Sequence, residues 1–141
     1  MENHKSLCPI NLALEVFGDK WSLIIIRDMM FGNKRYFKDL LSSEEKIATN
    51  ILADRLTKLE EEGIVSKTID PDHKLKYIYS LTFKGIDLLP VMTEIGHWGM
   101  KHLPFDEVKF QQAKKLLRSD KEQQKEMKKK IRKTHLHAPI K

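Results

Sequence analysis

The side chains best suited to chemistry in this chain lie on a helix predicted between residues 47 and 65. Leu52, Leu56 and Leu59 recur at i, i+4 and i+7, which is the spacing of one buried stripe on an α-helix. Since such a helix turns about 100° per residue, the polar side chains between the leucines point outward. Asparagine can pair bidentately with adenine, and a threonine methyl group can pack on the methyl group of thymine. We therefore expect contacts with duplex DNA, rather than ordinary solvent-facing positions, at Thr49, Asn50, Ala53, Asp54, Thr57 and Lys58.

The individual residues of this helix suggest different roles. Asp54 would repel a phosphate, so it needs either a cytosine amino group or a basic neighbour. Arg55 borders the leucine stripe, where it would either grip a phosphate or pair with an acidic side chain of the domain, and both alternatives stay open. Ala53 is small enough to let the helix approach the bases closely. Thr49 and Asn50 lie in the first turn, where backbone N–H groups suit a phosphate.

A second group of cationic side chains follows this helix. Two strand-like segments at 64–69 and 77–81 flank a polar, cationic loop at 70–76. Such a loop predicts contacts with the DNA backbone or the minor groove, and a solvated loop tip is the alternative. The loop residues concerned are His73, Lys74 and Lys76, and Lys34 and Arg35, further back in the chain, are expected to flank phosphates in the same way.

The elements around these side chains predict a winged helix-turn-helix. A short helix over 37–41 would pack on the next helix through Phe37, Leu40 and Leu41, and Gly63 suits a left-handed C-terminal cap. Two helices, a hairpin and a charged loop in this order make an α+β fold that is mostly α. Its second helix is the element that enters the major groove.

Additional helices are expected on both sides of this motif. A proline at the first position and a glycine at the end frame a helix at 10–17. Asp19 would cap the next helix, over 20–30, whose centre at Leu23–Ile26 is apolar all round and therefore predicts the buried helix of the domain. A strand competes for this β-branched run, but the apolar residues around it continue at helical spacing.

The C-terminal third is expected to be helical as well. Residues 82–103 predict one long helix that Pro90 should kink. Residues 105–133 divide into two helices, because the run from Ser119 to Glu122 matches a capping box. Residues 134–141 are expected to fray.

Composition narrows the class of protein. One cysteine excludes an internal disulfide, and the absence of a membrane-length apolar run or a signal peptide leads us to expect a cytoplasmic protein. Residues 106–141 hold 12 Lys and Arg against 5 Asp and Glu, whereas residues 1–105 hold 14 against 15. Phosphate binding by residues 1–105 must therefore come from local patches, and the basic tail is expected to add non-specific affinity or dimer packing.

Cys8 is the one candidate reactive side chain. It precedes Pro9 at a helix start, where the helix dipole, Lys5 and His4 would lower the pKa of the thiol. An inert thiol packed near a subunit interface is the alternative. The histidines show no tight metal-ligand spacing, and no phosphate loop or nucleophile–base pair stands out. We therefore expect no cofactor, no metal and no enzyme activity.

Taken together, these segments resemble the HxlR-type winged-helix transcriptional regulators of bacteria. The similarity runs from residue 8 to about residue 103 and departs from the family's pattern at Ala48, Lys76 and Ile78. The blocks that carry it, in chain order, are Cys8-Pro9, 18–28, Phe37-Lys-Asp-Leu40, 47–65, Tyr79-Ser-Leu-Thr82 and His97-Trp98-Gly99.

This resemblance implies a DNA-binding domain over 1–104 and a basic helical extension over 105–141. It also implies a homodimer, paired through N- and C-terminal helices, that represses or activates a nearby operon from a pseudo-palindromic operator. Some members of the family use the cysteine that matches Cys8 to sense oxidants or electrophiles, so a redox or small-molecule inducer fits this interpretation. The alternative is a winged helix that serves only as a protein-interaction module.

Overall fold

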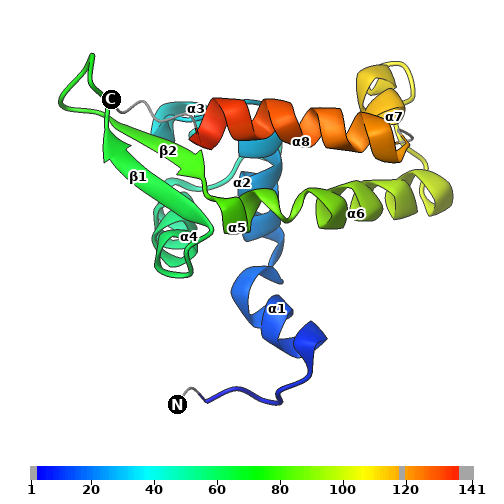
Figure 1. Cartoon of the computed structure of the whole chain (residues 1–141), viewed down its shortest axis with the longest axis horizontal. Coiled ribbons are helices and arrows are strands. Elements are labelled where there is room, and N and C mark those ends of the chain that lie inside the picture. Colours follow the sequence, from blue (N-terminus) through cyan, green and yellow to red (C-terminus); the bar gives the residue numbers. More distant parts are fainter. Residues whose placement is uncertain (1–2, 118–119, 137–141) are drawn as a thin grey trace.

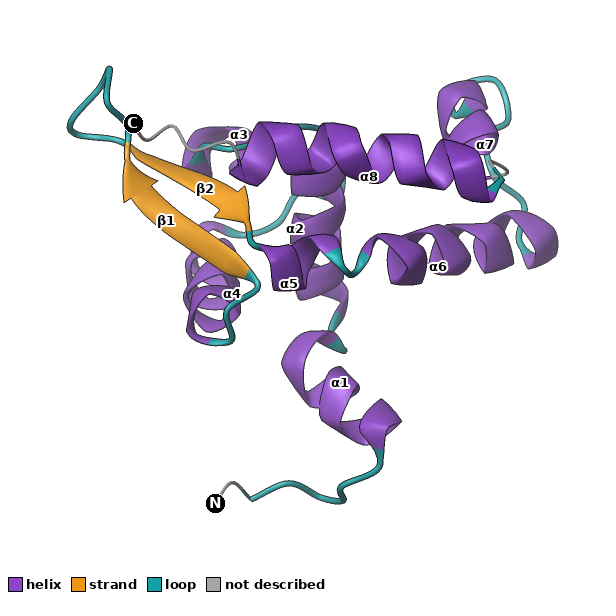
Figure 2. Ribbon diagram, viewed as in Figure 1, coloured by secondary structure: helices purple, strands orange, loops and turns teal. Residues whose placement is uncertain are grey.

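The chain forms a winged helix with further helices at both ends, as a computed structural model that describes residues 3–117 and 120–136 shows (Figure 1). Figure 2 shows that helices dominate the fold and that the strands form a single hairpin, which confirms the predicted fold class. None of the described helices is long and apolar enough to cross a membrane. The elements are α1 (Pro9–Phe17), α2 (Lys20–Met30), α3 (Phe37–Leu41), α4 (Thr49–Glu61), β1 (Val65–Ile69), β2 (Tyr77–Leu81), α5 (Phe83–Ile86), α6 (Leu89–His102), α7 (Gln111–Leu117) and α8 (Lys121–Leu136).

The hydrophobic core forms around α2, as its apolar centre predicts. Asp19 caps the helix by accepting a hydrogen bond from the N–H of Ser22 at 3.0 Å. Ile26 and Met29 are fully buried, and α2 contacts α3, α4, α6 and β2. The β-branched run in α2 is thus helical, because burial between several elements outweighs its intrinsic preference for a strand.

The wing is an antiparallel hairpin of β1 and β2. Val65 lies opposite Leu81, and Ile69 lies opposite Tyr77. The first pair is buried in the core, whereas the second is exposed, so the hairpin leaves the body of the domain and carries its loop into solvent. The first strand begins at Val65, one residue later than predicted.

The end of α4 confirms the predicted left-handed cap at Gly63, whose φ is +75°. The N–H of Gly63 donates to the carbonyl of Glu60 at 3.0 Å, and that of Ile64 donates to Leu59 at 2.9 Å. This is the Schellman pattern, which satisfies the last carbonyls of the helix. It turns the chain directly from α4 into the wing.

The prediction of one kinked helix over 82–103 is wrong. The chain instead forms α5 and α6, separated at Asp87 and Leu88. Pro90 has no N–H to donate to the carbonyl of Ile86, and its ring would crowd that carbonyl. The first helix therefore ends at Ile86, and Pro90 lies in the first turn of α6, where a missing N–H leaves no hydrogen bond unmade.

The predicted division of the tail into two helices is confirmed, and the described residues show a capping box at the start of the second helix. The reciprocal pair is Asp120 with Gln123: the carboxylate accepts from the N–H of Gln123, and the amide oxygen accepts from the N–H of Asp120, both at 2.9 Å. This pair makes the capping box one residue later than the sequence suggested. Ser119 lies outside the described residues.

The expectation of a frayed end is wrong for residues 134–136, which belong to α8. His135 is only 5% exposed. Its Nδ1 accepts a hydrogen bond from the N–H of Leu81 at 2.9 Å, and its Nε2 lies 3.1 Å from the carbonyl of Met29, to which a neutral imidazole donates. The ring therefore fastens the last turn of α8 to β2 and α2. Residues 137–141 lie outside the described residues.

Burial, assisted by the positive charge of Arg35, lowers the pKa of His135 to about 4. The neutral ring is thus the native form, and its contribution to stability is complete above the unfolded-state pKa of about 6.5. As pH falls from that value towards 4, the unfolded chain takes up the proton first, so stability is lost over this window. The full shift corresponds to about 3 kcal/mol.

We expect His135→Ala to lower the free energy of unfolding by about 2 kcal/mol at neutral pH, because Leu81 N–H and Met29 C=O lose a buried partner. Between pH 6.5 and pH 4, the free energy of unfolding of the variant should also fall less steeply than that of the wild type. Urea unfolding at a series of pH values measures both effects. The control is His97→Ala, which removes an exposed imidazole on α6; matching pH profiles for the wild type and His135→Ala would contradict the assignment.

Candidate nucleic-acid interface

The outward half of α4 carries the side chains that the sequence analysis selected. Leu52, Leu56 and Leu59 are buried against the domain. The positions expected to face solvent are all exposed and span the opposite half of the helix circumference: Thr49, Asn50, Ala53, Asp54, Thr57 and Lys58. A helix presented in this way can lie in a groove without uncovering its core residues.

Thr57 and Asn50 on this face offer different kinds of contact. The hydroxyl of Thr57 donates to the carbonyl of Ala53 at 3.0 Å, so the methyl group remains as the free end of the side chain. Within the described part of the chain, the amide of Asn50 makes no hydrogen bond, and it is exposed. Donor and acceptor groups of Asn50 are therefore free for a base edge, while Thr57 offers an apolar contact.

The structure distinguishes the two roles left open for Arg55. Its Nε donates to Asp19 at 2.9 Å, and an Nη donates to Asp54 at 2.6 Å. The hydrogen bond to Asp19 raises the pKa of Arg55. Arg55 thus joins α4 to the cap of α2 and is the basic neighbour that Asp54 requires, together with Lys58 at 3.6 Å.

A network that the sequence analysis did not identify holds the turn before α4. The guanidinium of Arg27 donates two hydrogen bonds to Glu45, at 2.7 and 2.8 Å, and two to Asp28, at 2.7 and 3.0 Å. Its hydrogen bonds lower the pKa of Glu45. Asp28 lies in α2, and Glu45 lies in the turn between α3 and α4. The hydrogen bonds of Arg27 therefore hold the segment that leads into α4 against α2. The sequence offers no spacing that would link residues 27 and 45.

The loop of the wing is organised by Asp70, which is buried. Its carboxylate accepts hydrogen bonds from the hydroxyl of Tyr36 at 2.7 Å and from the N–H of Asp72 at 2.9 Å. The hydrogen bond from Tyr36 lowers the pKa of Asp70. With its base held in this way, the loop presents His73 and Lys74 to solvent.

A groove of about 390 Å³ separates the wing from α3. It is lined in part by Lys76, whose Nζ lies 5.5 Å from the ring centre of Tyr36. Lys38 and Tyr77 line it as well, and neither was expected at this surface from the sequence. Lys38 directly follows Phe37 in the first helix of the motif, so its charge was visible, but its position opposite the wing was not.

Two of the predicted phosphate contacts lie elsewhere. Arg35 donates to the carbonyls of Tyr79 at 2.7 Å and Thr134 at 3.2 Å, and also to the hydroxyl of Ser80. Its guanidinium is thus engaged between β2 and α8. Lys34 is half-buried, with Nζ 3.9 Å from the buried carboxylate of Asp28. Phosphate binding by Arg35 and Lys34 stays a prediction, and internal partners compete for both charges.

Cys8 is exposed and forms the N-cap of α1. The N–H groups of Asn11 and Ile10 at the helix start lower the pKa of its thiol. A thiolate at this position is reachable from solvent, as an oxidant or electrophile requires. Among the described residues, no group of three or more His, Cys, Asp or Glu side chains could hold a metal ion.

Two exposed apolar surfaces lie away from α4. Helix α1 extends from the body of the domain (Figure 1) and buries none of its residues. Ile10 is 70% exposed and Leu14 is 55% exposed, while Trp98 on α6 is 60% exposed. These two helices therefore leave large apolar side chains in contact with water.

Comparison with known proteins identifies the same module. The family model described as HxlR-like helix-turn-helix matches residues 16–107. The HTH-type transcriptional regulator YodB of Bacillus subtilis is 36% identical over 94 residues, which cover 66% of this chain and 83% of that protein. The HTH-type transcriptional regulator YvaP of the same organism is 30% identical over 97 residues, which cover 68% of this chain and 89% of that protein.

Solved structures agree with this result. The redox regulator HypR in its oxidized form matches with a TM-score of 0.61 and 30% identity, over 70% of this chain and 100% of that chain. The reduced form of YodB from B. subtilis matches with a TM-score of 0.57 and 31% identity, over 69% of this chain and 95% of that chain.

Proposed function

The chain belongs to the HxlR-like helix-turn-helix family of transcriptional regulators, and from that premise we propose that the outward half of α4 reads bases in the major groove of duplex DNA. Asn50 and Thr57 are the proposed base contacts, and Ala53 allows close approach. Thr49 and Lys58 would bind phosphates at the edges of the groove. Asp54, whose charge is already offset by Arg55 and Lys58, would accept from a cytosine amino group with its remaining lone pairs. His73, Lys74 and Lys76 of the wing would add backbone contacts.

One observation carries this proposal: the polar half of α4 is exposed while its leucine stripe is buried. Figure 1 shows the wing and α4 at the same end of the molecule, away from α6 and α7. One face can therefore meet a groove and its flanking phosphates together. Since residues 1–105 have almost no net charge, binding would depend on these local cations rather than on the mean charge of the domain.

A homodimer is the second part of the proposal. The exposed apolar residues of α1 and α6 support it, because a second copy would remove them from water. Two recognition helices related by a two-fold axis would match half-sites about one DNA turn apart. Residues 105–141 would then act as an extension of a DNA-binding unit at 1–104, although α8 also supplies Ile131 to the shared core.

We expect Asn50→Ala to change which bases are preferred and Lys74→Ala to weaken binding to all sequences alike. A base contact discriminates between the right and the wrong base by about 1–3 kcal/mol. The loss of a phosphate contact instead lowers the slope of log affinity against log salt concentration by about one. The measurement is binding to a site selected from random DNA and to a scrambled duplex, at several salt concentrations. Equal losses on both duplexes for Asn50→Ala would refute the base contact.

The same titration separates DNA binding from a protein-interaction role. Phosphate contacts require a steep, linear fall of log affinity with log salt. A wild-type protein without measurable affinity for any selected duplex at low salt would favour the interaction module instead. Truncating the tail is not a clean control, because α8 contributes to the core.

Introducing a charge into the proposed dimer surface should produce a monomer. Leu14→Glu would place a carboxylate among the apolar residues of α1, and loss of the second half-site should lower operator affinity on the order of 100-fold. Light scattering and operator binding measure the two effects. Val108→Glu is the matched control, because Val108 is 86% exposed but lies outside α1 and α6; a Leu14→Glu dimer would argue against this surface.

Cys8 is proposed as the sensor of an oxidant or electrophile. Its exposure and lowered pKa support this role, and the similar protein HypR is named a redox regulator. With one thiol in each chain, oxidation can give an intersubunit disulfide, a mixed disulfide or an oxyacid. Each would alter the start of α1 and, through the proposed dimer surface, the spacing of the two recognition helices.

Diamide should therefore change the operator affinity of the wild type by about tenfold, which corresponds to about 1.4 kcal/mol. It should leave the affinity of Cys8→Ser unchanged. The assay is operator binding before and after treatment, followed by reduction with a thiol to restore the starting affinity. Identical responses of the wild type and Cys8→Ser would show that Cys8 is not the sensor.

A further inference from the structure

Helix α6 has two separate apolar sides. Ile95 and Trp98 lie one turn apart on the exposed side, where the ring of Trp98 is 4.8 Å from that of His102. Gly96 and Met100 lie one turn apart on another side, which faces α7. The first side belongs to the proposed dimer surface, so the second can stay open when two copies associate.

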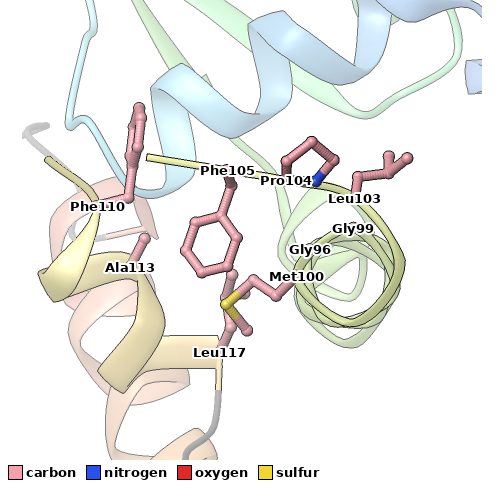
Figure 3. Close-up of a pocket in the computed structure, with 9 residues that line it drawn as sticks. All are labelled: Gly96, Gly99, Met100, Leu103, Pro104, Phe105, Phe110, Ala113 and Leu117. Atoms are coloured by element: carbon pink, nitrogen blue, oxygen red, sulfur yellow. The ribbon is translucent and has the colours of Figure 1, made fainter. Parts of the chain in front are cut away.

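A pocket lies between this second side of α6 and α7 (Figure 3). Its volume is about 330 Å³. In the close-up, Met100 extends from α6 toward Phe105 and Leu117, and Phe110 and Ala113 lie on the opposite side of the pocket. Among the described residues that line it, none carries a polar or charged side chain.

Two glycines of α6 give the pocket its shape. A Cβ on Gly96 would lie 2.6 Å from a methyl carbon of Leu117, so a side chain there would displace the end of that leucine. A Cβ on Gly99 would meet no described atom within 4 Å. The helix thus packs against α7 at one glycine and leaves room beside the other, where Gly99 borders the pocket.

We propose that this pocket binds a small, neutral aromatic ligand of about two fused rings. An engineered apolar cavity of roughly 150 Å³ in another protein binds benzene, and the volume here is about twice as large. The phenyl rings of Phe105 and Phe110 offer edge-to-face or offset contacts to such rings. The ligand is proposed to be neutral, because the described lining offers no polar side chain to pair with a charge.

The ligand would act on the wing through the C-terminal helices; this step rests on the proposed function. The amide of Gln124 on α8 donates to the carbonyl of Leu116 on α7 at 3.4 Å. At its other end, α8 is fastened to β2 by His135 and by the hydrogen bond from Arg35 to Thr134. Occupancy that displaces Leu117 therefore moves a helix whose far end holds the wing strand.

The probe is naphthalene, and the readout is the NMR signal of the methionine methyl groups. Binding should shift the Met100 methyl signal more than that of the buried core residue Met30. Gly99→Leu should fill the pocket and lower the affinity at least tenfold. Because leucine favours a helix more than glycine does, its thermal midpoint should not fall, so loss of binding is not loss of fold.

Lys101→Leu is the matched control, since it adds leucine at an exposed position of the same helix, and it should bind naphthalene as the wild type does. Light scattering on each variant verifies an unchanged oligomeric state. No Met100 shift in the wild type, or equal binding by Gly99→Leu, would overturn the ligand site. A Met100 shift that depends on protein concentration without naphthalene would instead assign the pocket to a second copy.

Operator affinity with and without naphthalene tests the coupling to the wing. A change of threefold or more in the wild type, absent from Gly99→Leu, is the expected result. Naphthalene binding with unchanged operator affinity would refute the coupling while leaving the pocket in place. Failure of the proposed function is distinguishable, because a protein without DNA affinity would still give the NMR result.

Discussion

The packing of α4 on α2 is the contact on which the rest of the molecule depends. Leu52 and Leu59 are fully buried, and they meet a helix whose own centre, at Ile26 and Met29, is equally buried. Close-packed leucines allow one rotation of α4 about its axis, because any other rotation would expose them and bury polar groups. The outward direction of Asn50 and Thr57 is therefore a consequence of core packing.

Polar contacts also fix the position of α4 relative to α2. Arg55 joins α4 to the cap of α2, and Arg27 joins α2 to Glu45 in the turn that leads into α4. Both are bonds between charged groups at the edge of the core, where partial burial strengthens them relative to ion pairs in open solvent. They hold the start and the middle of α4 in register with α2, so base-reading side chains would not depend on a flexible loop.

The C-terminal helix is part of the same structure. Ile131 lies in the hydrophobic core and His135 binds backbone groups of two other elements. Its basic residues face solvent on the remaining sides, where Lys129 and Lys133 are exposed. A segment that looks like a charged tail by composition thus supports the wing from behind, and this gives events at α6 and α7 a physical route to β2.

The sequence by itself determined the local features of this protein. Helical spacing of the leucines, the glycine after α4 and the aspartate before α2 each act within about two turns of chain, so their outcome is written in neighbouring residues. The exposed half of α4 and the charged wing loop followed from the same local rules.

Only the tertiary structure decided which distant groups meet. Arg35 looks like a phosphate contact until Thr134, 99 residues later, accepts its hydrogen bond. His135 looks like a frayed terminus until Leu81 and Met29 enclose it, and the break at Pro90 was underestimated as a kink. Partners so far apart in the chain leave no periodic signal, because three-dimensional packing, and not local propensity, brings them together.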